Sequence, residues 1–144
     1  MTNPFTTWQV WAILSAIFAA LTAIFAKIGI GDINSDFATF IRTCVILIVL
    51  GVILFLTRQY QSLNSVSHKS LLFLVLSGLA TGGSWICYFR ALKIGTASQV
   101  APIDKLSVVL VAIFAVVFLG EQITISHWLG IGLIAAGAVV IALQ

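Results

Sequence analysis

Five long runs of apolar residues dominate this sequence, and each is close to the length that a helix needs to cross a lipid bilayer. A helix rises 1.5 Å per residue, so about 20 residues cross the ~30 Å hydrocarbon core. The runs are continuous rather than alternating, which argues against the strands of a membrane β-barrel. The sequence therefore predicts five transmembrane helices, over residues 8–26, 37–57, 70–92, 96–119 and 127–143.

The composition agrees with a chain that is surrounded by lipid. Hydrophobic residues make up 61% of the 144 residues and charged residues only 8%, whereas soluble proteins carry about 45–50% apolar and about 25% charged residues. A soluble protein of this size could not bury so much apolar surface. We therefore expect an all-α, multi-pass protein of the inner (plasma) membrane, in which residues 1–144 form a single transmembrane domain.

Other classes of protein find little support. The net charge of +3 comes from basic residues that form no cluster, so nucleic acid is not an expected partner. Cys44 and Cys87 lie in separate apolar runs, where buried unpaired thiols are commoner than a disulfide or a metal site. Neither His68 nor His127 has ligand spacing to a cysteine or an acid, so no cofactor is expected. An enzyme is disfavoured, since no metal motif, nucleophile–base pair or phosphate-binding loop is found.

The basic residues bias the membrane orientation only weakly. Arg58 and Lys69 fall on the side of the N-terminus and the second and fourth connections, and the other five basic residues lie toward the opposite side. This distribution favours a cytoplasmic C-terminus under the positive-inside rule, although two of the five lie within helices. We predict a weak or dual orientation. A chain that inserts both ways can pair with an inverted copy of itself, which supplies the inverted repeat found within many transporter chains.

The first half of the fourth apolar run contains three residues that suit a lipid-facing helix poorly, namely Pro102, Asp104 and Lys105. In a helix that starts at Thr96, Lys105 lies ~13 Å deep. A charged side chain there costs ~2.5–3.5 kcal/mol, which favours burial against a partner or a water-filled cavity. Neighbouring helical residues point ~100° apart, so Asp104 and Lys105 are not expected to neutralise each other face to face.

Two positions of the helix start give this segment different roles. A start at Thr96 places Pro102 inside the helix, where it removes a backbone hydrogen bond and acts as a kink or hinge. A start near Ala101 places Pro102 in the first turn, with Asp104 favourable at the positive end of the helix. Asp104 is accordingly either a capping residue or a proton site.

Arg42 lies about two turns into the second run, counted from Asp36, and either Ser35 or Asp36 is expected to cap this helix. The guanidinium of Arg42 either reaches back to the membrane surface or faces a cavity, where it attracts an anionic group or pairs with Asp104. Lys27, at the end of the first run, is expected to reach the membrane surface.

A semi-polar stripe marks the third run. Its members recur at helical spacing and share one face: Thr81, Ser84, Trp85 and Tyr88. Trp and Tyr in the middle of a span predict an aromatic-walled pocket, with core packing as the alternative. The first run carries a matching stripe of Trp11, Ser15, Ala19 and Thr22. The predicted substrate-binding residues are therefore Trp11, Ser15, Arg42, Ser84, Trp85, Tyr88 and Lys105.

The fifth run has no charged residue and scarcely a polar atom after Trp128. Small residues let helices approach closely in a membrane. We therefore predict that this helix pairs with a second copy through Gly130, Gly132, Ala136 and Gly137.

Several segments, in this order, resemble the EamA-type domain of the drug/metabolite transporter superfamily over essentially the whole chain. They are "FAKIG" at 25–29, Arg42, "YFRALKIG" at 88–95, "ASQVAPIDKLSVV" at 97–109, "LGEQIT" at 119–124 and "WLGIGLIAAG" at 128–137. The usual member of that family holds ten helices, as two inverted five-helix halves around a central cavity. The resemblance implies that this chain supplies one half and works as a dimer, with an antiparallel arrangement favoured.

The fifth run is also similar to the last helix of the small multidrug resistance exporters. Those exporters depend on a Glu in the middle of their first helix. Here the first run has no carboxylate and Glu121 lies in a loop, so their proton–drug exchange is not carried over.

The resulting expectation is a homodimeric transporter that exports a small metabolite or drug-like solute by alternating access. A basic cavity favours an anionic or zwitterionic solute. The alternatives are a lipid-carrier flippase, which moves a phosphorylated head group past Arg42 and Lys105, and a non-transporting membrane subunit that assembles with another five-helix chain.

Overall fold

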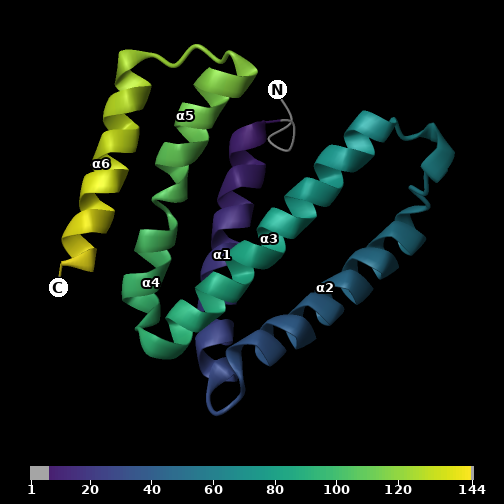
Figure 1. Cartoon of the computed structure of the whole chain (residues 1–144), viewed down its shortest axis with the longest axis horizontal. Helices are drawn as coiled ribbons and strands as arrows, with labels where there is room; N and C mark the ends of the chain where they lie inside the picture. The colour runs from purple at the N-terminus through teal and green to yellow at the C-terminus, as the bar shows by residue number, and fades with distance from the viewer. Residues whose placement is uncertain (1–6, 144) are drawn as a thin grey trace. The chain divides into compact units, whose positions relative to one another are not determined.

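A computed structural model describes residues 7–143, and these residues form helices joined by short connections (Figure 1). The elements are α1 (Trp8–Ile30), α2 (Ser35–Thr57), a short 3₁₀-helix η2 (Leu63–Ser65), α3 (His68–Ile94), α4 (Ala97–Asp104), α5 (Ser107–Leu119) and α6 (Ile125–Ala142). Five spans in the described part are long and apolar enough to cross a membrane, with α4 and α5 together making the fourth, Ala97–Leu119. The predicted all-α class with five transmembrane helices is confirmed.

Most side chains of these spans are exposed in the single chain. At most 11% of the most apolar window of any span is buried, and large residues such as Leu47 and Phe55 are 72% and 68% exposed. Apolar surface of this extent has to face lipid or another protein. The chain is therefore a multi-pass membrane protein. The helices also run past the apolar runs, by four residues where α1 continues to Ile30.

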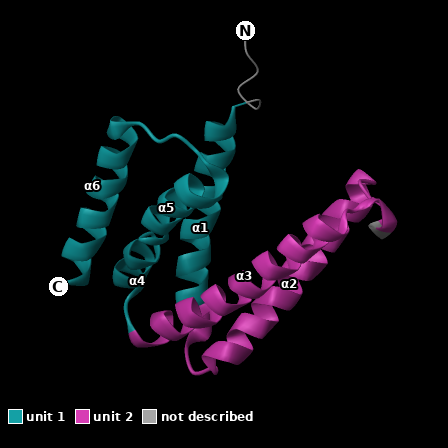
Figure 2. Cartoon of the chain, turned by 45° about the horizontal axis from the view of Figure 1, so that its top comes forward, with its two compact units in different colours: residues 1–27, 95–144 teal, residues 28–94 magenta. Residues whose placement is uncertain are grey.

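The chain divides into two compact units (Figure 2). Unit 1 comprises residues 1–27 and 95–144, and unit 2 comprises residues 28–94. Unit 1 contains most of α1 together with α4, α5 and α6, whereas unit 2 contains α2 and α3.

Unit 2 is an antiparallel pair of long helices, in which α2 and α3 lie side by side (Figures 1 and 2). Asn34 caps the start of α2, because its side-chain Oδ1 accepts the backbone N–H groups of Asp36 at 2.9 Å and Phe37 at 3.2 Å. The prediction that Ser35 or Asp36 is the cap is wrong. The helix begins at Ser35, two residues before the predicted start at residue 37, and its first turn therefore includes Asp36.

In unit 1, α4 and α5 pack against α6. The buried residues of these helices are mostly small, and they include Ala112 and Ala115 in α5 and Ala138 in α6. Small side chains allow close helix approach where lipid gives no hydrophobic driving force. Lys27, near the end of α1, donates a hydrogen bond from Nζ to the backbone oxygen of Gly95 at 2.7 Å. This contact joins the first and second segments of unit 1.

The fourth span is interrupted after Asp104, whereas the start at Thr96 predicted one helix over residues 96–119 with a kink at Pro102, so the predicted position of the break is wrong. The N–H groups of Lys105 and Leu106 bond to oxygens three residues earlier, those of Pro102 at 3.1 Å and Ile103 at 3.0 Å. Bonds to the third preceding residue tighten the backbone into a 3₁₀-type turn. α4 begins at Ala97 with Thr96 in the N-cap position, so the alternative start near Ala101 is also wrong. Pro102 lies inside α4, shortly before the interruption.

Candidate functional site

A cation–aromatic contact joins the two helices of unit 2. The guanidinium carbon of Arg42 in α2 lies 3.9 Å from the ring centroid of Trp85 in α3 and 5.5 Å from that of Phe89. A guanidinium within about 6 Å of an aromatic centroid is attracted to the negative face of the ring, most strongly for Trp. Phe89 is only 3% exposed, and Arg42 and Trp85 are half-buried. Two of the predicted binding residues thus meet in the structure.

Phe89 was absent from the predicted site. Helical spacing could have identified Phe89, because it lies four residues after Trp85 and therefore on the same face of the helix. Tyr88 is half-buried one residue earlier, and Ser84 is exposed.

The side chain of Arg42 reaches across to a residue of α3 that lies at nearly the same height along the hairpin. It follows Asp36 by six residues in α2, while Trp85 precedes Arg90 by five residues in the antiparallel α3. Asp36 and Arg90 are themselves partners, so Arg42 and Trp85 are nearly level with each other. Arg42 also lies seven residues into α2, or about 10 Å along its axis. The two predicted roles of the guanidinium, at the membrane surface or in a cavity, stay predictions.

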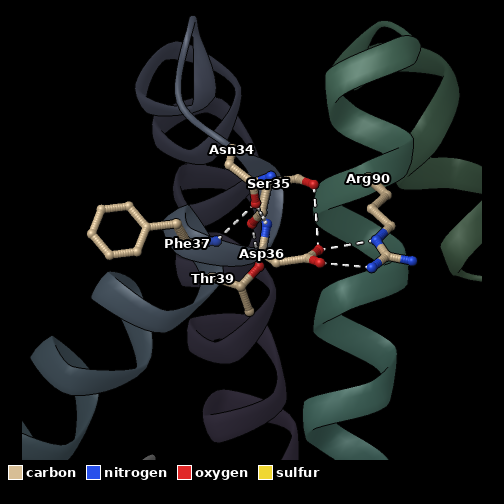
Figure 3. A network of polar contacts seen from close by, with 6 residues as sticks. All are labelled: Asn34, Ser35, Asp36, Phe37, Thr39 and Arg90. Atoms are coloured by element: carbon tan, nitrogen blue, oxygen red, sulfur yellow. Dashed lines mark hydrogen bonds and ion pairs between the residues drawn. The ribbon is translucent and has the colours of Figure 1, made fainter.

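A bidentate ion pair joins the start of α2 to the end of α3 (Figure 3). Arg90 donates from Nε to Oδ1 of Asp36 at 2.9 Å and from Nη2 to Oδ2 at 2.6 Å. Paired N–H donors of this kind match a carboxylate and fix its orientation. Close by, the Nζ of Lys93 donates to the backbone oxygen of Ile33. The sequence analysis predicted no partner for Arg90 or Lys93.

The pairing of Asp36 with Arg90 follows from the register of the antiparallel hairpin. The separation along the chain falls from 60 residues for Ile33 and Lys93 to 54 for Asp36 and Arg90. The separation thus shrinks by two for each residue along α2, which is expected for antiparallel helices with the same rise. Any acid and base that satisfy this rule are candidates for a pair.

Unit 1 holds the segment around Lys105. The Nζ of Lys105 lies 3.4 Å from Oδ2 of Asp104, so the two neighbours do form an ion pair, contrary to the prediction. The helix ends at Asp104, and Lys105 has a ψ of −8°, so the spacing of a regular helix does not apply. Asp104 is the last residue of α4 rather than part of a first turn, and its capping role is wrong. Its role as a proton site stays a prediction, as does the hinge role of Pro102.

The remaining predicted residues are exposed on unit 1. They are Trp11 and Ser15 in α1, Lys105, and the small residues Gly130, Gly132, Ala136 and Gly137 in α6. Exposure leaves the α6 surface open to a second chain, and its role in a dimer stays a prediction. Cys87 is exposed and Cys44 half-buried, so the expectation that both thiols are buried is wrong for the single chain.

Known proteins resemble the chain over most of its length. A Sinorhizobium sp. protein named "Uncharacterized transporter in cobO 3'region" is 60% identical over 136 residues, which cover 94% of this chain and 96% of that protein. A protein of Methanocaldococcus jannaschii is 27% identical over 92% of this chain and 93% of its own length.

A third relative, from Hamiltonella defensa, carries the name "Probable 4-amino-4-deoxy-L-arabinose-phosphoundecaprenol flippase subunit ArnE". It is 28% identical over 99 residues, which cover 62% of this chain and 89% of that protein. No solved structure matches the chain. The sequence pattern of the EamA-like transporter family matches residues 6–143, and together with the 60% identical relative this shows that the chain is a member of that family.

Proposed function

We propose that this EamA-family membrane transporter works as a homodimer, that it moves a small solute by alternating access, and that Arg42 and Trp85 line the path. The observation that carries the proposal is the contact of the Arg42 guanidinium with Trp85, at 3.9 Å and about two turns inside α2. A charged side chain at this depth is costly in lipid. A charged side chain that faces a water-filled solute path avoids this cost.

The other predicted residues keep their predicted roles, each within its own unit. In unit 2, Tyr88 offers an aromatic ring and Ser84 a hydroxyl group, and in unit 1, Trp11 and Ser15 offer the same two kinds of group. Lys105 adds positive charge, Asp104 carries a proton if transport is coupled to protons, and the interruption after Pro102 lets the fourth span bend as access alternates. Two five-helix chains in opposite orientations supply the inverted repeat that alternating access uses in many transporters. The exposed small residues of α6 support pairing through that helix.

A second candidate function is movement of a lipid-linked head group, with the chain as one subunit of a flippase. The relative that is named a flippase subunit favours it. In this case the chain requires a different partner chain, and the purified protein alone shows no transport. In the homodimer proposal the purified protein is sufficient.

Transport by purified protein in proteoliposomes tests the proposal. Pools of small metabolites are screened for movement with and without a proton gradient, and the active solute is then used with Arg42→Ala and Trp85→Ala. We expect the transport rate to fall by about 10-fold or more for each variant, because interactions of a charged group contribute about 1.5–3 kcal/mol.

Matched control variants are available for both substitutions. Arg58→Ala removes a basic residue at the end of α2, and Trp8→Ala removes an exposed tryptophan at the start of α1. Both are expected to transport at the wild-type rate. Folded Arg42→Ala and Trp85→Ala proteins that match the controls would contradict the site, and a silent wild-type protein would favour the subunit function.

A further inference from the structure

Arg42 differs from four other basic residues of the spans in the kind of partner it has. The others have an oxygen atom as partner: Lys27 with Gly95, Arg90 with Asp36, Lys93 with Ile33 and Lys105 with Asp104. Arg42 contacts the rings of Trp85 and Phe89. Within residues 7–143, no hydrogen bond or ion pair joins its guanidinium to another residue.

A guanidinium carries five N–H donors and no acceptor. The faces of Trp85 and Phe89 attract its positive charge, but aromatic carbons offer no lone pair to these donors. Donors left without an acceptor in a low-dielectric span cost free energy, so an acceptor is needed from elsewhere. No fully buried side-chain nitrogen or oxygen lacks a partner in the described part of the chain, so the Arg42 nitrogens that have no acceptor are not fully buried in the single chain.

The partner that best fits these free donors is an oxyanion. Carboxylate and phosphate oxygens accept two parallel N–H bonds from one guanidinium, and such bonds are short and strong. The rings of Trp85 and Phe89 lie against the same guanidinium and offer apolar surface beside it. A molecule with an oxyanion on an apolar or aromatic body matches both features.

We infer that Arg42 binds the oxyanion of the transported molecule, a carboxylate or a phosphate, while Trp85 holds the guanidinium in place for it. This inference rests on the proposed function and names the substrate class of the same site. The oxyanion comes either from a free solute or from the phosphate of a lipid-like molecule. The positive charge of Arg42 disfavours a cationic drug at this position.

The test is binding to wild-type protein in phosphatidylcholine nanodiscs, measured by isothermal titration calorimetry. Benzoate and inorganic phosphate represent free anions, dodecyl phosphate represents a lipid phosphate, and tetraphenylphosphonium represents a cation. We expect at least one of the anions to bind, and Arg42→Gln to weaken it by about 10-fold to 100-fold, as expected for hydrogen bonds to a charged group. Arg58→Gln, which removes the same charge outside the site, leaves the affinity unchanged.

A second variant keeps the test decisive if Arg42→Gln does not fold. Arg42→Lys retains the charge but loses the paired donors, so anion affinity falls several-fold while binding remains measurable. Binding of dodecyl phosphate without the free anions supports the inference with a lipid phosphate as the source. Binding of benzoate or inorganic phosphate supports it with a free solute.

Three results overturn the inference: equal anion affinity in wild-type, Arg42→Gln and Arg42→Lys proteins, no binding of any anion, or Arg42-dependent binding of tetraphenylphosphonium alone. Failure of the proposed function looks different. Arg42-dependent anion binding without transport in proteoliposomes removes the transport role and keeps the anion site. Arg42-dependent transport of a cation keeps the function and removes the anion site.

Discussion

In unit 2, an ion pair joins two helices that are far apart in the sequence, whereas the ion pair of unit 1 links two adjacent residues. The Asp36–Arg90 pair spans 54 residues. The Asp104–Lys105 pair links adjacent residues, and Thr124 and Ser126 are two positions apart. The contact of Lys27 with Gly95 is an exception in unit 1. Otherwise, the packing of α4 and α5 on α6 involves small apolar residues.

This difference indicates two ways of fixing helix register in lipid. Lipid tails are as apolar as the side chains, so apolar contact alone gives little driving force for helix association. Unit 2 has directional bonds from charged side chains between its helices, and such bonds favour one register. Unit 1 relies on shape, because alanine side chains leave room for close approach. Substitutions that change charge should therefore lower the stability of unit 2, and substitutions that change side-chain volume should lower the stability of unit 1.

The largest expected effect on stability is that of Asp36→Arg. The new side chain faces Arg90 with the same charge, removes both hydrogen bonds, and places a cation at the positive N-terminal end of α2. Asp36→Asn should be milder, because the amide oxygen still accepts one bond. Thermal unfolding in detergent, followed by circular dichroism, ranks the variants.

The double substitution D36R/R90D restores the pair in reversed order. We expect partial recovery, since the cation remains at the start of α2. The matched variant in unit 1 is Asp104→Arg, which should lower the unfolding temperature much less, because Lys105 is free to turn away. Equal losses for Asp36→Arg and Asp104→Arg would contradict the distinction between the two units.

The second effect in size concerns Ala138, which is 4% exposed in α6. Ala138→Leu adds volume to a packed position and should destabilise the protein by about 1–3 kcal/mol. Ala136→Leu adds the same volume on an exposed face of the same helix. It should leave the unfolding temperature nearly unchanged and instead weaken the proposed dimer. Thermal unfolding and the oligomer mass in detergent, from light scattering, separate the two outcomes.

Features that depend on length and local composition could be predicted from the sequence. The five spans followed from apolar runs near 20 residues, and Arg42 and Trp85 were singled out because charge and aromatic nitrogen are unusual inside lipid. The cap of α2 was missed by one or two positions because Asn34, Ser35 and Asp36 are all good capping residues. Propensity alone does not choose among three neighbours of similar preference.

Features that depend on contacts between helices could not be predicted in the same way. The contact of Arg42 with Trp85 and the pair of Asp36 with Arg90 require the register of the hairpin, which hydropathy does not contain. The interruption at Lys105 lies after Pro102, whereas a proline removes a bond to the residue four positions before it. Its position therefore had no local signal. Residues were identified more reliably than their partners.

The smallest expected effect compares the C-terminal caps of α2 and α5, which both lie in the left-handed region. Gly120 after α5 has a φ of 68°, and Arg58 after α2 has a φ of 51°. A side chain in this conformation costs about 1–2 kcal/mol relative to glycine. Nothing lies within 4 Å of a Cβ built on Gly120, so Gly120→Ala should destabilise the protein by about 1 kcal/mol through the backbone alone. Arg58→Gly should instead stabilise the protein, and comparing it with Arg58→Ala separates the effect of the backbone conformation from that of the lost charge. Thermal unfolding of the three variants checks both signs, and a stabilising Gly120→Ala would show that α5 does not end in this conformation.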